Sequence, residues 1–227
     1  TITITITITI RITITTTITM PITSITKKEL IDFESEIAEK FNKGLIRSPI
    51  HLYNGNEDQI IKFFSRVKKE DWVFCTWRSH YQCLLKGVSK FELKKEIIEG
   101  KSISLCFPKY KIYSSAIVGG NLPIALGVAM GNKYKKNNSK VYCFVGDMSA
   151  ETGIMYETLK YATNFNLPIH FIIEDNNLSV CTNTRKVWKS KRLLFENFDD
   201  GNVLVIQDNI LDKFDLWLPF VEVRDIQ

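Results

Sequence analysis

Oxygen-bearing side chains follow two stretches of this chain that have the composition of buried parallel strands. The apolar run 141–145 leads into Gly146 and Asp147, and the run 169–173 leads into a polar stretch that contains Asn176. Between the runs, apolar residues recur at helical spacing: Ile154, Met155, Leu159, Ala162 and Phe165. A strand, a helix and a second strand in this order place both strand ends at one edge of a parallel sheet. We therefore expect Asp147 and Asn176 to lie close enough to share a cation.

The chemistry predicted for this edge is the binding of magnesium beside a phosphate. Mg²⁺ prefers oxygen ligands and takes only one or two from the protein when phosphates and water supply the rest. Ser149 is expected to cap the helix after Asp147, and the free NH groups at a helix start favour an anion. The alternative is ordinary turn chemistry at Asp147 and Asn176. Spacing alone leaves both interpretations open.

Composition limits the class of protein. A chain of 227 residues that is 44% hydrophobic can form one sizeable core. The net charge of +5, with Lys scattered among Asp and Glu, gives no indication of a nucleic-acid partner. The sequence contains no apolar run long enough to span a membrane, so we do not expect a membrane protein. The five cysteines form no Cys-x-x-Cys pair and fall mostly in apolar runs, which indicates reduced, buried residues. Since the start lacks a secretory pattern, we expect a cytoplasmic protein.

Helix signals punctuate the first half of the chain. Thr26 and Ser89 each begin a capping-box pattern, and the helices that follow are expected to end near Gly44 and Gly100. Asp58 is expected to cap a further helix between them.

Strand signals complete the pattern. Short apolar runs at 72–76, 103–107 and 203–207 suit strands, and a helix rich in small residues is expected over 121–133. This order predicts an α/β fold with a mostly parallel sheet flanked by helices.

Three segments differ in character. Residues 1–20 are almost pure Thr-Ile alternation, typical of an aggregation-prone strand or of a simple repeat translated in frame, with Met20 as the true start; we favour the second. Residues 21–190 are expected to form the α/β domain. Residues 191–227 carry no motif, and we assign them no function.

Several ordered motifs, between about residues 27 and 188, resemble those of one enzyme family. They are the segments 51–59, 76–80, 116–123 and 146–147, a helix with Gly153 and Glu157, Leu167-Pro168, and 174–177. Together they resemble the thiamine diphosphate fingerprint of the alpha subunits of 2-oxo acid dehydrogenases, the first component of the pyruvate and branched-chain complexes. The resemblance implies a thiamine diphosphate-binding fold, with thiamine diphosphate and magnesium as cofactors.

The resemblance also assigns the metal and diphosphate end of the cofactor. Asp147 and Asn176 would bind magnesium by side chain and Leu178 by its carbonyl oxygen. The residues flanking Asp147 would surround the diphosphate: Gly146, Met148 and Ser149.

The upstream motifs imply further contacts. Arg78 would meet the diphosphate with its planar fork, and Trp77 stands at the family's aromatic position. Backbone groups of Ala116 and Val118 would hold the aminopyrimidine ring. His80 is a catalytic candidate, and a hydrogen-bonded core histidine is its alternative.

Three departures bear on activity. Met148 stands where the family has glycine, no histidine follows His170, and the glutamate that activates the cofactor comes from a separate beta subunit in this family. The implied function is oxidative decarboxylation of a 2-oxo acid, with acyl transfer to a lipoyl carrier and a beta subunit as partner. Two alternatives stay open: half of a split transketolase-like enzyme, and a truncated, noncatalytic cofactor-binding protein.

Overall fold

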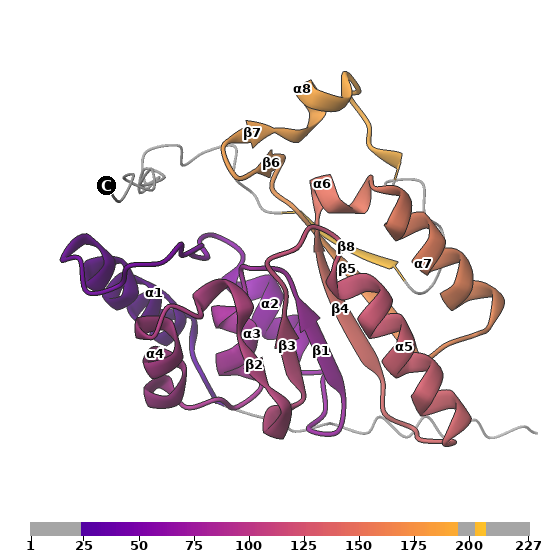
Figure 1. Ribbon diagram of the computed structural model, residues 1–227, viewed down its shortest axis with the longest axis horizontal. Coiled ribbons are helices and arrows are strands. Elements are labelled where there is room, and N and C mark those ends of the chain that lie inside the picture. Colours follow the sequence, from indigo (N-terminus) through magenta and orange to yellow (C-terminus); the bar gives the residue numbers. More distant parts are fainter. Residues whose placement is uncertain (1–23, 195–202, 208–227) are drawn as a thin grey trace, which may run out of the picture.

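The computed structural model describes residues 24–194 and 203–207, so the Thr-Ile segment and most of the last segment lie outside the described residues. A six-stranded sheet, ordered β2-β3-β1-β4-β5-β8, organises the rest (Figure 1). Its strands are β1 (Trp72–Cys75), β2 (Cys106–Phe107), β3 (Ile112–Ser114), β4 (Val141–Gly146), β5 (Ile169–Asp175) and β8 (Val203–Gln207). All neighbours pair in parallel except β2 with β3. The predicted α/β class is confirmed.

Helices cover both faces of this sheet (Figure 1). One face packs against α1 (Lys27–Asn42), α2 (Glu57–Phe64), α3 (His80–Leu85) and α4 (Lys90–Ile98). The other packs against α5 (Asn121–Tyr134) and α7 (Gly153–Asn164). Alternating residues of a strand enter opposite cores: Phe144 joins the first cluster, whereas Cys143 and Val145 join the second. Because both faces are covered, β1 and β4 are almost entirely apolar, and β5 is apolar in its middle but ends in Glu174 and Asp175.

Short elements connect this framework. Two 3₁₀ turns, Ser102–Ser104 and Pro108–Tyr110, flank β2, so the predicted run 103–107 is half turn and half strand. The short helix α6 (Asp147–Ala150) follows β4. After β5 comes a small hairpin of β6 (Leu178–Ser179) and β7 (Thr182–Asn183), and then α8 (Thr184–Trp188).

Helix starts match the predictions in part. Thr26 forms a complete capping box with Glu29, and Ser89 caps α4 by accepting from the Glu92 amide. The cap predicted at Asp58 is wrong, because Asn56 precedes the helix and Asp58 lies in its first turn.

Two further local predictions are corrected. Ser149 caps nothing: it lies inside α6, and Thr152 precedes α7. Of the five cysteines, Cys106 and Cys181 are exposed, because β2 is an edge strand and Cys181 lies in the hairpin turn.

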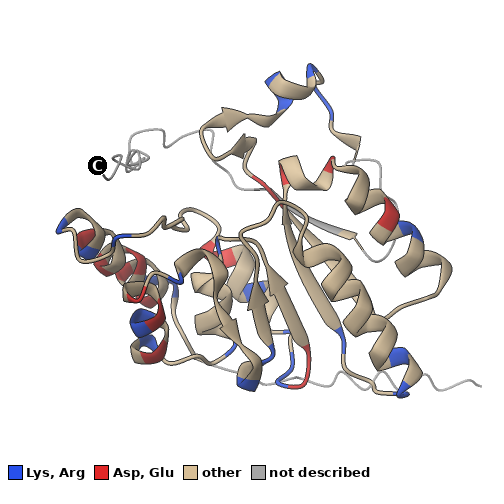
Figure 2. Ribbon diagram, in the orientation of Figure 1, with Lys and Arg blue, Asp and Glu red and all other residues tan. Residues whose placement is uncertain are grey.

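Charged residues of both signs share α1 and α4 (Figure 2). Lys90 and Lys94 of α4 reach Glu29 and Glu36 of α1 at 3.1 and 2.6 Å. Partly exposed pairs of this kind contribute little stability, so the buried apolar cores hold the fold. None of the helices in the described part of the chain is both long and apolar enough to span a bilayer.

Candidate functional site

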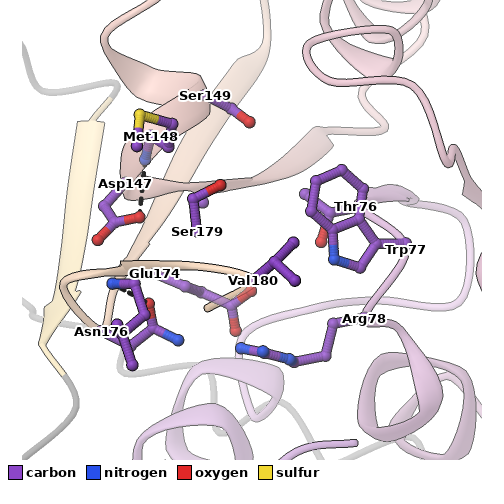
Figure 3. A pocket seen from close by; sticks show the side chains of 12 residues that line it. Thr76, Trp77, Arg78, Asp147, Met148, Ser149, Glu174, Asn176, Ser179 and Val180 are labelled. Atoms are coloured by element: carbon purple, nitrogen blue, oxygen red, sulfur yellow. Dashed lines mark hydrogen bonds between the residues drawn. The ribbon is translucent and has the colours of Figure 1, made fainter. Parts of the chain in front are cut away.

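The carboxyl ends of three neighbouring strands build one cavity. β4 and β5 pair in register so that Gly146 lies beside Glu174, and β1 ends on the other side of β4. The residues that line the cavity are Thr76, Trp77, Arg78, Gly146, Asp147, Met148, Ser149, Glu174, Asn176, Leu178, Ser179 and Val180 (Figure 3). Its volume of about 40 Å³ is enough for a few waters.

Asp147 is a deeply buried carboxylate in this cavity. Its side chain is almost completely buried, and Oδ1 accepts a hydrogen bond of 2.7 Å from the Met148 amide (Figure 3). Oδ2 is buried and makes no hydrogen bond of normal geometry among the described residues, although Thr184 and Asp175 lie close enough to affect the pKa of Asp147. Burial, together with the nearby Asp175 charge, raises the pKa of Asp147 to about 6. A bound cation would satisfy this orphaned oxygen.

Asp175 is satisfied within the protein. Arg185 of α8 clamps it with two hydrogen bonds, Nη1 to Oδ1 at 3.0 Å and Nη2 to Oδ2 at 2.8 Å. Burial acts to raise the pKa of Asp175, but the Arg185 hydrogen bonds and charge outweigh it and hold the pKa below its usual value. The clamp fastens the segment after β5 to the sheet and leaves Asp147 as the carboxylate open to a ligand.

The other two predicted metal ligands lie at the same cavity. Asn176 Oδ1 accepts from the Leu178 amide at 3.0 Å, which folds this segment into a turn over the strand ends. No cluster of three or more His, Cys, Asp or Glu side chains occurs in the described residues. One carboxylate with an amide and a carbonyl oxygen is a donor set for magnesium with phosphate, not for zinc. The residues present therefore fit the implied metal.

Arg78 faces the cavity from the β1 side. Its Nε is buried and has no hydrogen-bond partner among the described residues, and Cζ lies 5.7 Å from the centre of the Tyr53 ring. Trp77 packs against His51 with ring centres 5.6 Å apart. Burial and the Arg78 charge lower the pKa of His51 to about 4, so His51 is neutral at pH 7. The available cation at this end of the cavity is Arg78.

Two predicted cofactor contacts lie outside the cavity lining. Ala116 and Val118 belong to the exposed loop before α5. In this loop Gly119 has φ +70°, and a Cβ there would lie 2.6 Å from a methyl carbon of Ile154. The loop therefore has a defined, glycine-dependent path, and the aminopyrimidine role of Ala116 and Val118 stays a prediction.

His80 is not brought to the cavity. It is completely buried; its Nδ1 lies 2.9 Å from Glu34 Oε2 and its Nε2 2.9 Å from Ser102 Oγ. The other Glu34 oxygen, Oε1, accepts from the Tyr53 amide at 3.3 Å. With both ring nitrogens hydrogen-bonded and its side chain outside the cavity lining, His80 has the surroundings expected of the structural alternative, and Glu34 links it to the loop that carries Tyr53. A catalytic role of His80 stays a prediction.

Four lining residues were not predicted as site residues: Thr76, Glu174, Ser179 and Val180. A signal for Glu174 is available in the register, since it pairs with the Gly146 that precedes Asp147. The sequence contains no such signal for Val180. This β-branched residue lines the cavity because of a turn in which it has φ +57°, a conformation that β-branched residues rarely adopt.

The sequence is similar to those of several known proteins. Residues 26–197 match the family model of the dehydrogenase E1 component. The alpha subunit of an acetoin:2,6-dichlorophenolindophenol oxidoreductase from Bacillus subtilis is 30% identical over 68% of this chain and 49% of its own length. Two pyruvate dehydrogenase E1 alpha subunits are similarly related. The chloroplastic subunit alpha-3 from Arabidopsis thaliana is 28% identical over 69% of this chain and 42% of its own length. The subunit from Rickettsia prowazekii is 30% identical over 68% of this chain and 50% of its own length.

The chain spans about half the length of these curated relatives. Among solved structures, a candidate thiamin diphosphate-dependent enzyme from Mycobacterium smegmatis aligns with 50% of this chain and 19% of its own, at 17% identity. The TM-score of this alignment is 0.34. The family match covers well over half of the sequence and includes every residue that lines the cavity. By that match, the chain belongs to the dehydrogenase E1 component family.

Proposed function

We propose that this chain is the alpha-like subunit of a thiamine diphosphate-dependent 2-oxo acid dehydrogenase and binds the diphosphate and magnesium end of the cofactor. The observation that supports the proposal is that one cavity contains both a carboxylate and a guanidinium, each with a buried polar atom that makes no hydrogen bond of normal geometry among the described residues. Asp147 presents a buried carboxylate oxygen that needs a cation, and Arg78 presents a buried NH that needs an anion. A magnesium diphosphate supplies both.

Each side chain has a separate task in this proposal. Asp147, Asn176 and the Leu178 carbonyl would hold magnesium, and Arg78 would neutralise diphosphate oxygens. Gly146, Met148 and Ser149 would line the diphosphate, and the Met148 side chain would narrow that end. When bound, thiamine diphosphate supplies the carbanion chemistry that cleaves the bond next to a carbonyl. This chain anchors the end of the cofactor remote from that chemistry.

In this proposal, the complete reaction needs two protein partners. Turnover would require a beta-type subunit to contribute the activating glutamate, and the acyl group would pass to a lipoyl carrier. Because one relative at 30% identity is an acetoin oxidoreductase subunit, acetoin is a second substrate candidate beside a 2-oxo acid.

Calorimetric titration of the chain with thiamine diphosphate tests the proposal, with and without Mg²⁺. We expect Mg²⁺-dependent binding, and Asp147→Ala should weaken it at least tenfold because a metal ligand is lost. Asp32→Ala, which removes an exposed carboxylate paired with Lys28 on α1, is the control and should bind normally. Binding that is absent in the wild type, or unchanged in Asp147→Ala, contradicts the proposal.

Activity decides between the functional alternatives. The chain mixed with a beta-type subunit should consume a 2-oxo acid or acetoin. Cofactor binding without turnover of either substrate favours a noncatalytic cofactor-binding protein, and turnover of sugar phosphates favours the transketolase-like alternative.

A further inference from the structure

Tyr53 connects the two groups of opposite charge at the β1 side of the cavity. Its hydroxyl lies 2.9 and 3.0 Å from the two carboxylate oxygens of Glu174, and its ring lies under the Arg78 guanidinium. The same hydroxyl accepts a hydrogen bond from Gln82 Nε2 and lies 3.3 Å from the Arg78 carbonyl oxygen. Tyr53 is therefore within reach of both Glu174 and Arg78, although it lines neither the strand ends nor the cavity.

Glu174 poses a problem for any anion at this site. It is a buried carboxylate that lines the same cavity as Arg78, so it would repel a diphosphate and attract the guanidinium. Among the described residues, however, no ion pair joins Arg78 to Glu174. The carboxylate instead accepts from the Tyr53 hydroxyl and, at 3.2 Å, from Asn56 Nδ2.

Tyr53 is well suited to hold this carboxylate. Its hydroxyl remains protonated, because burial and the Glu174 charge raise its pKa well above the usual value, so it donates to Glu174 while it accepts from Gln82. Its ring stacks on Tyr81 with centres 4.7 Å apart, and its amide is bonded to Glu34. Ring, hydroxyl and backbone are thus all fixed.

We propose that Tyr53 is a positioning residue that keeps Arg78 available to an anion by holding the buried Glu174 carboxylate away from the guanidinium. Without the hydroxyl, Glu174 would pair with Arg78 and compete with the diphosphate. The inference rests on the proposed function for the identity of the anion, but the competition itself concerns only this chain's residues.

Calorimetry with inorganic pyrophosphate and with magnesium thiamine diphosphate tests the inference on the full chain. Tyr53→Phe keeps the ring and removes the hydroxyl, and we expect it to weaken both affinities about tenfold. The double variant Tyr53→Phe/Glu174→Gln should recover to within about threefold of the wild type, because a neutral amide cannot form the competing ion pair.

Tyr81→Phe is a matched control. Tyr81 is also a buried tyrosine of the same stacked pair, and its hydroxyl donates to a different carboxylate, Glu57, at 3.0 Å. Both substitutions remove a buried tyrosine hydroxyl that donates to a carboxylate, and the Tyr53 hydroxyl also accepts from Gln82. Both should therefore lower thermal stability, Tyr53→Phe at least as much as Tyr81→Phe, but only Tyr53→Phe should change affinity.

The outcomes separate the two proposals. Wild-type chain that binds neither anion overturns the proposed function, and this inference with it. Wild-type binding that Tyr53→Phe leaves unchanged, or a loss that Glu174→Gln does not recover, overturns the role of Tyr53 alone. A loss in Tyr81→Phe equal to that in Tyr53→Phe would mean a general packing effect and would also overturn it.

Discussion

At the scale of single residues, the ends of β4 and β5 contain a buried charge that lowers the stability of the folded chain and is suited to bind a cation. Asp147 is buried with one oxygen unsatisfied, whereas its neighbour Asp175 is neutralised by Arg185. An unsatisfied buried carboxylate destabilises the folded chain, and such groups persist where a ligand satisfies them. The contrast between two adjacent aspartates is thus itself a functional signal.

Replacing this charge should stabilise the unliganded protein. Asp147→Asn keeps the acceptor for the Met148 amide and removes the buried charge, so we expect the free energy of unfolding at pH 7.5 to rise by on the order of 1–2 kcal/mol. Urea denaturation of both proteins without Mg²⁺ measures this difference in the free energy of unfolding.

The stability difference between Asp147→Asn and the wild type should depend on pH. The folded-state pKa of Asp147, about 6, lies above the ordinary 3.8, so the carboxyl group's stabilising contribution is present below about pH 3.8 and is lost as the pH rises through 6. The difference between Asp147→Asn and wild type should therefore shrink on going from pH 7.5 to pH 4. An equal difference at both values would show that burial does not raise this pKa.

At the scale of elements, the predictions that held were those with local causes. Thr26 forms its capping box, and the periodic apolar residues of 153–164 form α7, because both patterns are satisfied within a few residues. Asp58 and Ser149 failed as caps because several polar residues near a helix start are chemically suitable, and the path of the chain decides which one precedes the helix.

The loop before α5 provides an element-scale prediction. Gly119 has φ +70° and no room for a Cβ, so Gly119→Ala should lower the free energy of unfolding by about 2 kcal/mol or more. Gly127→Ala, within α5 and facing open space, is the matched control and should be neutral or stabilising by up to about 1 kcal/mol, since alanine favours helix. Urea denaturation of both variants measures the contrast; equal losses would contradict the close approach to Ile154.

At the scale of the whole molecule, β4 is the strand that ties both cores and the site together. Phe144 contacts the core under α1–α4, Val145 contacts the core under α5 and α7, and the next two residues enter the cavity. Substitutions that disturb the packing of β4 should therefore reduce both the stability of the fold and the binding of a ligand.

Phe144→Ala should lower the free energy of unfolding by about 3–5 kcal/mol, because it leaves a cavity among aromatic rings of α2. The comparison variant is Phe91→Ala, whose side chain is 82% exposed and whose loss should cost less than about 0.5 kcal/mol. Chemical denaturation of both proteins measures the difference, and similar losses would contradict the assignment of the core.

The sequence by itself determined the strand, helix and strand around Asp147 and Asn176, because hydrophobic periodicity and crossover handedness are local rules that place both strand ends at one edge. It did not determine that His80 is sealed between Glu34 and Ser102, or that Tyr53 reaches Glu174, 121 residues later. Those contacts join segments that no periodicity relates, and only the packing of helices against the sheet brings them together. The tertiary structure therefore decided which polar residues support the site and which remain open to a ligand.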